Sequence, residues 1–193
     1  MSALSLRTSA HRLLSGWEPP DAAQDALRHT YLAFLDRTPD ACLRSSVTGH
    51  LTGSVVVFDA SLSYVLLTLH PRVGRWLQLG GHCEEADETI HDAAAREARE
   101  ESGISDLHVT TAIALLDMHP VTCSLGMPTR HLDVQFAAVA PATEDGRTPA
   151  VTRSHESTDL AWWPADQLPA GVGGGVSALV ATGIAAVRAV SSS

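Results

Sequence analysis

Three glutamates stand close together in a segment of helical character. Glu100 and Glu101 follow Glu97 by three and four residues, so the three side chains project from nearly one face of a helix. Three carboxylates repel one another in that arrangement, and a hard divalent cation such as Mg²⁺ or Mn²⁺ relieves the repulsion because it takes oxygen ligands. Such an ion can bridge phosphate oxygens and lower the pKa of a bound water. These residues therefore favour metal-dependent hydrolysis of a phosphoanhydride.

Two neighbouring features fit that chemistry. Arg96 lies beside the acidic face, where it can pair with Glu100 or reach back to Glu88, so its expected task is to orient a carboxylate. Gly80 and Gly81 precede the helix and let the backbone approach an ion closely, so a carbonyl there could serve as a further ligand.

The helix that must carry the glutamates is expected from Ile90 to Ser102. Thr89 can cap its start, with Asp92 reaching back as in a capping box, and Gly103 is placed to end it. Strand-like runs on both sides indicate a mixed α/β or α+β domain. These runs are 51–58, 64–70, 76–79, 107–118, 130–140 and 160–163, and a closing helix is expected at 176–190.

The segment from Gly80 to Ile104 resembles the Nudix box, Gly-x5-Glu-x7-Arg-Glu-U-x-Glu-Glu-x-Gly-U, in which U is an aliphatic residue. From Glu88 onward the match in spacing is complete, but six residues rather than five separate Gly81 from Glu88. Either Asp87 takes the first acidic position or the loop is one residue longer. We prefer the longer loop, because loops absorb insertions better than helices do.

The resemblance to Nudix hydrolases implies an α/β/α sandwich with a mixed sheet. It also implies hydrolysis of a diphosphate linkage in a nucleoside diphosphate derivative or a nucleoside triphosphate, with Mg²⁺ as the expected ion and Mn²⁺ as a substitute. Glu97 would act as the base or orient a water, and Gly81 and Glu88 would support the site. The implied metal ligands are Glu97, Glu100, Glu101 and the carbonyl of Gly80, and the implied catalytic residues are Glu97, Glu100 and Arg96.

Outside the box, the alternating run 130–136 places His131, Asp133 and Gln135 on one face of a strand. That polar face either lies in water or lines the substrate cleft. Similarity to bacterial Nudix proteins with a His-x-Asp strand after the box favours the cleft, so Arg130, His131 and Asp133 are candidate substrate contacts.

Nudix enzymes commonly recruit another carboxylate from outside the box. The resemblance selects Glu156, which precedes the strand-like run 160–163. The alternative for Glu156 is an ordinary solvated position in a loop.

Residues 1–45 are expected to form a helical extension, and residues 46–193 the Nudix domain. Asp21 can cap a helix at 22–35, and a shorter helix is expected near 4–14. The extension carries no chemical motif. Apolar positions of the longer helix, notably Leu27, Tyr31 and Leu35, need a surface to cover, either the protein's own sheet or a second subunit of a homodimer.

The composition excludes several classes of protein. The net charge of −9 argues against nucleic acid as a partner. All 13 basic residues are arginine, so the chain has no Walker-A P-loop and no Schiff-base lysine. The three cysteines, Cys42, Cys83 and Cys123, form no CxxC pair, so reduced thiols are expected. The chain shows no signal-peptide core and no suitable membrane span, so we expect a cytoplasmic protein that acts on a small phosphorylated substrate, a nucleotide.

Two other functions stay open. An isopentenyl-diphosphate-isomerase-like enzyme uses the same scaffold but adds a catalytic cysteine and another set of metal-binding histidines, for which Cys83 and His82 are a poor match. A nucleotide-sensing Nudix-like domain binds its ligand without cleaving it. Such domains typically lose box glutamates and carry a DNA-binding part, whereas all three helix glutamates stand here and the extension offers no basic recognition helix.

Overall fold

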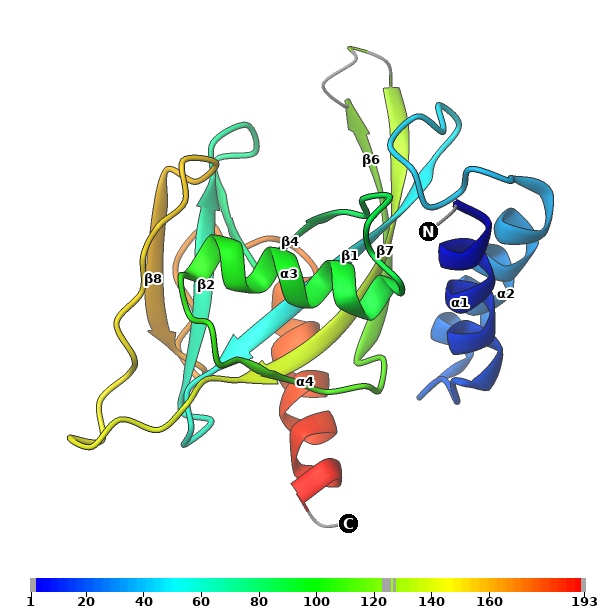
Figure 1. Cartoon of the computed structure of the whole chain (residues 1–193). Helices are drawn as coiled ribbons and strands as arrows, with labels where there is room; N and C mark the ends of the chain where they lie inside the picture. The colour runs from blue at the N-terminus through cyan, green and yellow to red at the C-terminus, as the bar shows by residue number, and fades with distance from the viewer. Residues whose placement is uncertain (1–2, 123–125, 127, 192–193) are drawn as a thin grey trace.

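A computed structural model of the chain describes residues 3–122, 126 and 128–191. One mixed sheet lies between helices, with α3 (Ile90–Ser102) on one face and α4 (Val176–Ser191) on the other (Figure 1). The helical pair α1 (Ala3–Gly16) and α2 (Ala22–Arg37) stands beside the sheet. This arrangement confirms the expected α/β/α sandwich with a helical N-terminal part.

The strands that the described residues form all belong to one sheet. Its central pair is parallel, and the other strand pairings are antiparallel. The parallel pair is β1 (His50–Phe58) and β7 (Pro128–Val139), and the other edge of β1 is shared by β2 (Tyr64–His70) and β4 (Leu79–His82). Strand β2 is flanked by β3 (Arg75–Leu77) and β8 (Asp159–Pro164). Strand β7 pairs along successive parts with β5 (His108–Val109) and β6 (Leu115–Thr122).

The central strand β1 shows why the sheet carries helices on both faces. All nine of its residues are buried, as expected of a strand that is covered on both sides. Leu51 and Val55 belong to the core under α3, whereas Val56 and Phe58 belong to the core under α4. Burial of apolar surface in these two layers is the main term that stabilises the sandwich.

The strand expected over 107–118 is instead two strands, β5 and β6. From Val109 to Leu115 the chain advances six residues, while the opposite positions on β7 advance three, from Ala138 to Gln135. The excess residues must leave the ladder, as in a β-bulge. An alternating hydrophobic pattern gives no sign of such a break, so the single-strand prediction was wrong here.

The box helix α3 begins and ends where the sequence predicts. Thr89 Oγ1 accepts the N–H of Asp92 at 3.0 Å, and the Asp92 carboxylate accepts the N–H of Thr89 at 3.1 Å, which confirms the capping box. Gly103 follows in the left-handed conformation, with φ of 72°. The buried face of α3 consists mostly of alanines, whose small side chains let the helix lie close to the sheet.

Of the two surfaces that α2 could cover, it covers the protein's own sheet. Tyr31 and Leu35 are buried in the same core as α3, and Leu27 packs against that core. The Tyr31 hydroxyl donates to the carbonyl oxygens of Asp117 on β6 (2.6 Å) and Asp133 on β7 (3.1 Å). The extension and the sheet thus share one core, and a boundary at residue 45 stays a prediction.

The same helix protects the edge strand β6. The Gln24 side-chain amide accepts the N–H of Leu116 at 2.8 Å and donates to the Leu116 carbonyl at 3.0 Å. Trp17 Nε1 donates to the Ile113 carbonyl just before the strand, at 3.1 Å. An exposed edge strand can pair with another chain, and these contacts hinder such pairing along β6.

The second face of the sheet is covered by α4. Its residues Val176, Leu179, Val180 and Val187 pack with Phe58. Across the described ranges, none of the helices combines the length and the apolar character that a membrane crossing requires.

Candidate active site

The box helix α3 directs Glu101 at the strand β4. Glu101 Oε2 accepts a hydrogen bond from the backbone N–H of Gly80 at 2.9 Å. Burial raises the pKa of the Glu101 carboxyl group to about 7; the Gly80 bond lowers it, and three neighbouring glutamates raise it further. A nearby cation strongly stabilises the ionised form of a carboxylate that burial has deprived of water.

Glu97 lies against the next residue of the same strand. A Cβ atom on Gly81 would lie 2.6 Å from the Glu97 carboxyl carbon, so a side chain at position 81 would displace this carboxylate from its present place. The Glu97 side chain is 14% exposed, with Oε1 3.1 Å from Arg96 Nη1. Burial raises the pKa of Glu97, while the charge of Arg96 lowers it. Gly81 therefore makes room for Glu97 beside the carboxylate of Glu101.

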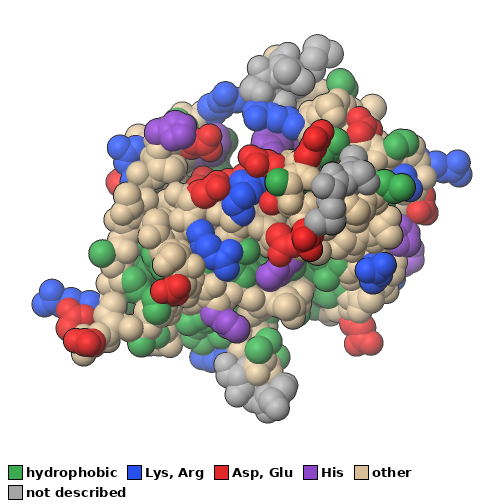
Figure 2. Space-filling model, viewed as in Figure 1, with side chains coloured by type: hydrophobic (Ala, Val, Ile, Leu, Met, Phe, Trp, Pro, Cys, Tyr) green, Lys and Arg blue, Asp and Glu red, His purple; other side chains and the backbone are tan. Residues whose placement is uncertain are grey.

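Arg96 joins the parts of this acidic cluster. Its Nη1 lies 3.2 Å from Glu100 Oε2, which confirms the expected pairing one turn along the helix. Its Nη2 donates to the His82 carbonyl at 3.0 Å and so ties α3 to β4. In Figure 2, acidic and arginine side chains gather side by side on the face that α3 presents to the viewer.

Asp87, and not Glu88, is the buried carboxylate that Arg96 contacts before the helix, and the exposed Glu84 lies farther away at 3.9 Å. Asp87 is buried and accepts two hydrogen bonds from Arg96, at 3.1 and 3.2 Å, while the side chain of Glu88 is exposed. The expected pair of Arg96 with Glu88 is thus corrected. Five residues separate Asp87 from Gly81, as the box requires, and Asp87 lies one position earlier than the count back from Arg96 suggests. The alternative in which Asp87 takes the first acidic position therefore fits this contact better than the longer loop.

Glu100 and Glu156, which were also predicted as site residues, are more open to solvent than Glu97 and Glu101. The Glu100 side chain is 60% exposed, and that of Glu156, in the segment before β8, is 67% exposed. The charge of Glu156 nevertheless raises the pKa of both Glu97 and Glu101. Glu156 is therefore a loop residue that lies within electrostatic reach of the acidic helix.

The groups around Glu97 and Glu101 suit a hard divalent cation. The two poorly hydrated carboxylates and the backbone oxygens of the adjacent glycine pair are oxygen donors, the type that Mg²⁺ and Mn²⁺ prefer. The close fit of Glu97 against Gly81 brings its carboxylate to the backbone of the glycine pair. Burial is the largest cause of the raised pKa of each carboxyl group, so a cation beside them would stabilise their ionised forms.

Asp133 organises the polar face of β7. It is 3% exposed, and its carboxylate accepts hydrogen bonds from Thr52 (2.9 Å), Ser54 (2.6 Å) and Gln135 (2.9 Å). Burial raises the pKa of Asp133, while these bonds lower it. Asp133 and Gln135 are therefore packed within the protein, so the alternative of a face in water does not hold for them. The preferred assignment of this face to the substrate cleft stays a prediction.

At the outer end of that face the structure brings in histidines that the sequence did not connect. Arg130 is exposed, whereas His131 is half-buried, with its ring centroid 5.0 Å from those of His50 and His82. His50 was not predicted as a site residue. Its position opposite His131 in the parallel β1–β7 register is the signal, and strand pairing is not visible in one sequence.

The described cysteines lie away from solvent. Cys83 is 5% exposed, with Sγ 3.9 Å from the Leu51 carbonyl, and burial raises its thiol pKa. Burial also raises the pKa of Cys42, to about 12. Both thiols are free, and Cys123 lies outside the described residues, so reduced cysteines stay an expectation.

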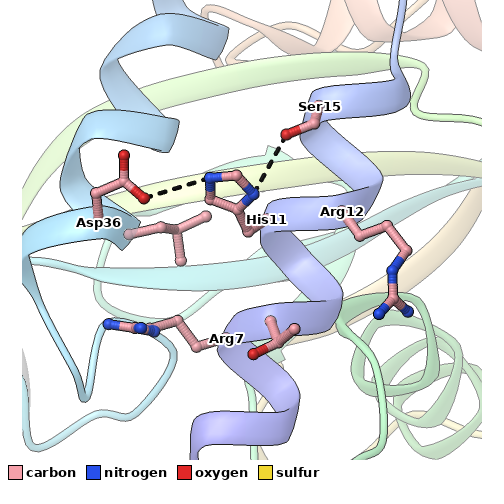
Figure 3. Close-up of a pocket in the computed structure, with 7 residues that line it drawn as sticks. Arg7, His11, Arg12, Ser15 and Asp36 are labelled. Carbon is pink, nitrogen blue, oxygen red and sulfur yellow. Dashed lines mark hydrogen bonds and ion pairs between the residues drawn. The ribbon is translucent and has the colours of Figure 1, made fainter.

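A separate pocket of about 400 Å³ lies between α1 and α2. Arg7, His11 and Arg12 line it from α1, and His11 Nε2 lies 3.3 Å from Asp36 Oδ1 (Figure 3). The lining shares no residue with the acidic helix or with β4. The pocket is therefore separate from the acidic cluster on α3.

Fold and site together define an α/β/α protein whose acidic helix faces a glycine pair on the neighbouring strand. The family model described as the NUDIX domain matches residues 49–179, more than half of the chain. The chain therefore belongs to the Nudix family. With all three helix glutamates in place, it is an enzyme of the Nudix pyrophosphohydrolase class.

Solved structures agree on the fold. The chain is similar to the dihydroneopterin triphosphate pyrophosphohydrolase of E. coli (19% identity, 72% of this chain and 95% of the other, TM-score 0.54). It is also similar to an Ap4A hydrolase of C. elegans (17%, 72% and 98%, 0.51) and to the NUDIX domain of Shewanella oneidensis NrtR complexed with ADP ribose (21%, 71% and 87%, 0.52). No curated protein sequence gives a significant match.

Proposed function

We propose that this protein is a divalent-metal-dependent hydrolase that cleaves a diphosphate linkage in a nucleoside diphosphate derivative or a nucleoside triphosphate. The observation that carries the proposal is the placement of Glu101. Its buried carboxylate is held by the Gly80 N–H, beside Glu97, with a pKa of about 7. Two largely buried carboxylates next to the backbone of a glycine pair fit a cation site better than a structural role.

Each box residue has a distinct task in this proposal. Glu97 and Glu101, with Glu100 from the exposed side and the Gly80 carbonyl, hold Mg²⁺, for which Mn²⁺ can substitute. When bound, the ion supplies positive charge for the phosphate oxygens and Lewis-acid activation for the attacking water. Arg96 is a positioning residue, because it contacts Glu97 and Glu100 at 3.1 and 3.2 Å and fixes both.

The proton of the attacking water needs an acceptor. Glu97 is our choice, because burial raises its pKa towards the working range of a general base. Glu156 is the second carboxylate within electrostatic reach. Because Glu156 is largely exposed, we assign it to the rim of the site, where substrate phosphates would enter.

The fold does not select the substrate. The three similar proteins named above take an Ap4A substrate, a dihydroneopterin triphosphate substrate and an ADP-ribose ligand, so loops and side chains outside the box must choose. Arg130 and His131 on β7 are our candidates for substrate contacts. Asp133 is buried, so we assign it a supporting role there. A cytoplasmic location, a nucleotide as the substrate and a homodimer remain parts of the proposal.

The isomerase alternative requires a reactive cysteine near its metal. Cys83 is buried in the core under α3 and its thiol pKa is raised, which disfavours the thiolate. The sensing alternative usually goes with loss of box glutamates, and Glu97, Glu100 and Glu101 all stand here. Hydrolysis is therefore the function that we prefer.

A phosphate-release screen tests the proposal. The full chain is incubated with Mg²⁺ and with Mn²⁺ against nucleotide sugars, ADP-ribose, dNTPs and dinucleoside polyphosphates, with a chelator as the control. We expect release from at least one class, abolished by the chelator. Binding without release from any class would favour the sensing function, and turnover of isopentenyl diphosphate alone would favour the isomerase.

A further inference from the structure

Three histidines from three strands meet on the face of the sheet that lies opposite α3. His50 begins β1, His82 ends β4, and His131 lies on β7 (Figure 1). Their ring centroids are 5.0 Å apart in every pair, and one ring nitrogen of each lies within 4.8 Å of the others. Among the described residues, no other set of three histidine, cysteine or acidic side chains meets so closely.

The backbone ladder fixes this triangle. His50 pairs with His131 in the parallel register of β1 and β7, and His82 pairs with Thr52, two residues along β1 from His50. Side chains alternate along a strand, so His82 points away from the face on which Gly81 contacts Glu97. The histidines and the box carboxylates therefore lie on opposite sides of β4.

The spacing of the rings matches that around one metal ion. With Zn–N bonds of about 2.0–2.1 Å and tetrahedral angles, the centroids of three ligating imidazoles lie about 5 Å apart. The planes of the three rings are tilted by 40°, 55° and 88°, so the rings are not stacked on one another. One nitrogen of each ring lies within 4.8 Å of the other two instead, which is the arrangement that a shared ion needs.

A neighbouring carbonyl orients one of the rings. His50 Nδ1 lies 3.2 Å from the Ser46 carbonyl oxygen. A carbonyl can only accept, so Nδ1 carries the proton and the lone pair is on Nε2. Metal-binding histidines typically use their second nitrogen in this way.

The three rings are buried or half-buried. Burial disfavours the charged imidazolium, so it favours the neutral imidazole that a metal ion binds. Neutral imidazoles offer lone pairs and no charge, so they suit a cation better than a phosphate. The positive charge of Arg44 would repel a bound metal ion, but the Arg44 side chain is exposed, and water screens its charge.

We propose that His50, His82 and His131 form a site for a divalent transition-metal ion of the Zn²⁺ type, separate from the Mg²⁺ site of the box. Imidazole selects zinc, cobalt, nickel or copper, whereas the box carboxylates select hard ions. Three protein ligands leave one position of a tetrahedral ion for a further ligand. His119 lies beside it, with its ring centroid 5.4 Å from that of His131 and its Nδ1 2.8 Å from Asp117. This site stands whether or not the box hydrolyses diphosphates.

Metal titration of the full, tag-free chain tests the proposal. The protein is stripped with a chelator and returned to a large excess of Mg²⁺, which occupies the hard-ligand site. Co²⁺ is then added and followed by visible absorption, and Zn²⁺ affinity is measured by competition with a chromophoric chelator. We expect one equivalent of Co²⁺ with the intense visible bands of a tetrahedral nitrogen site, and we expect Zn²⁺ to raise the melting temperature.

Four variants separate this site from other metal binding. His131→Ala and His82→Gln should each weaken Zn²⁺ binding at least about tenfold, whereas His155→Ala, which removes a histidine that is 93% exposed, should not change it. Glu101→Gln should keep the Co²⁺ equivalent. If the wild type shows no tetrahedral Co²⁺ spectrum, or if the folded His131 and His82 variants bind Zn²⁺ as it does, the proposal is wrong. The wild-type spectrum decides the matter even if a variant fails to fold.

Discussion

Arg96 donates two parallel hydrogen bonds to Asp87, from Nε to Oδ1 at 3.2 Å and from Nη2 to Oδ2 at 3.1 Å. The Asp87 side chain is only 6% exposed, and its Oδ2 also accepts the N–H of Glu84 at 2.8 Å. Because Arg96 also reaches the His82 carbonyl, the pair anchors the loop between β4 and α3 at both ends. The loop in turn fixes β4, against which the carboxylates of Glu97 and Glu101 lie.

Removing the charge of Asp87 should therefore cost stability and activity together. Asp87→Asn breaks a buried charge-assisted pair, and we expect unfolding to become easier by about 2 kcal/mol. Turnover should fall because Arg96 no longer holds Glu97 and Glu100 in place. The matched control is Glu88→Gln at an exposed position, with an expected change within about 0.5 kcal/mol. Urea unfolding measures the loss of stability in both variants. If Asp87→Asn and Glu88→Gln lose the same free energy of unfolding, Glu88 supports the site as much as Asp87 does.

Glu101 should make the metal-free protein less stable at high pH. Its pKa is about 7 in the folded chain and 4.5 ordinarily, so between these values the unfolded state ionises first and stability falls as pH rises. Metal-free Glu101→Gln should consequently melt a few degrees higher than the wild type at pH 8. The difference should shrink as pH falls below 7 and vanish below about 4.5.

Mg²⁺ provides the matching control for that experiment. It should raise the melting temperature of the wild type at pH 8 and raise that of Glu101→Gln much less, because the variant has lost a ligand. If metal-free Glu101→Gln melts below the metal-free wild type throughout this pH range, the protein stabilises the Glu101 charge without an ion.

Cys83→Ala should retain most of the hydrolytic activity. The thiol is buried in the core under α3, and phosphate chemistry with a hard ion needs no sulfur ligand. A stability loss of about 1 kcal/mol is expected from the small cavity. The measurement is Mg²⁺-dependent phosphate release by the folded variant. Complete loss of release at every Mg²⁺ concentration would instead point to a covalent or isomerase mechanism.

Deleting residues 1–45 should lower thermal stability or disrupt an oligomer, while leaving the metal affinity of the box largely intact. The deletion removes Tyr31 and Leu35 from the core and uncovers the edge of β6. Tyr31→Phe is the milder variant, expected to cost about 1–2 kcal/mol because the Asp117 and Asp133 carbonyls lose their donor. Calorimetry, light scattering and Mg²⁺ titration test both. A truncated chain that is equally stable and equally associated but inactive would place the extension in the active site.

The sequence was most informative where local rules act. The cap at Thr89, the stop at Gly103 and the helix between them follow from side chains that contact their near neighbours in the chain. It was misleading at Asp87, because box spacing counts residues and cannot show which of two adjacent carboxylates turns inward to Arg96.

Contacts between distant strands could not be predicted from the same patterns. The meeting of His50 with His131 depends on the parallel register of β1 and β7, which joins segments about eighty residues apart in the chain. The break between β5 and β6 likewise depends on how β7 pairs with each of them. Both are properties of the assembled sheet.

The turnover of Glu101→Gln tests the central claim most directly. The substitution keeps the shape of the side chain and an acceptor for the Gly80 N–H, but it removes the charge that would hold the ion. On the substrate that the wild type hydrolyses, with saturating Mg²⁺ and matched circular dichroism, we predict that kcat falls by orders of magnitude. Near-normal turnover by the folded variant would contradict the assignment of α3 as the metal-binding helix.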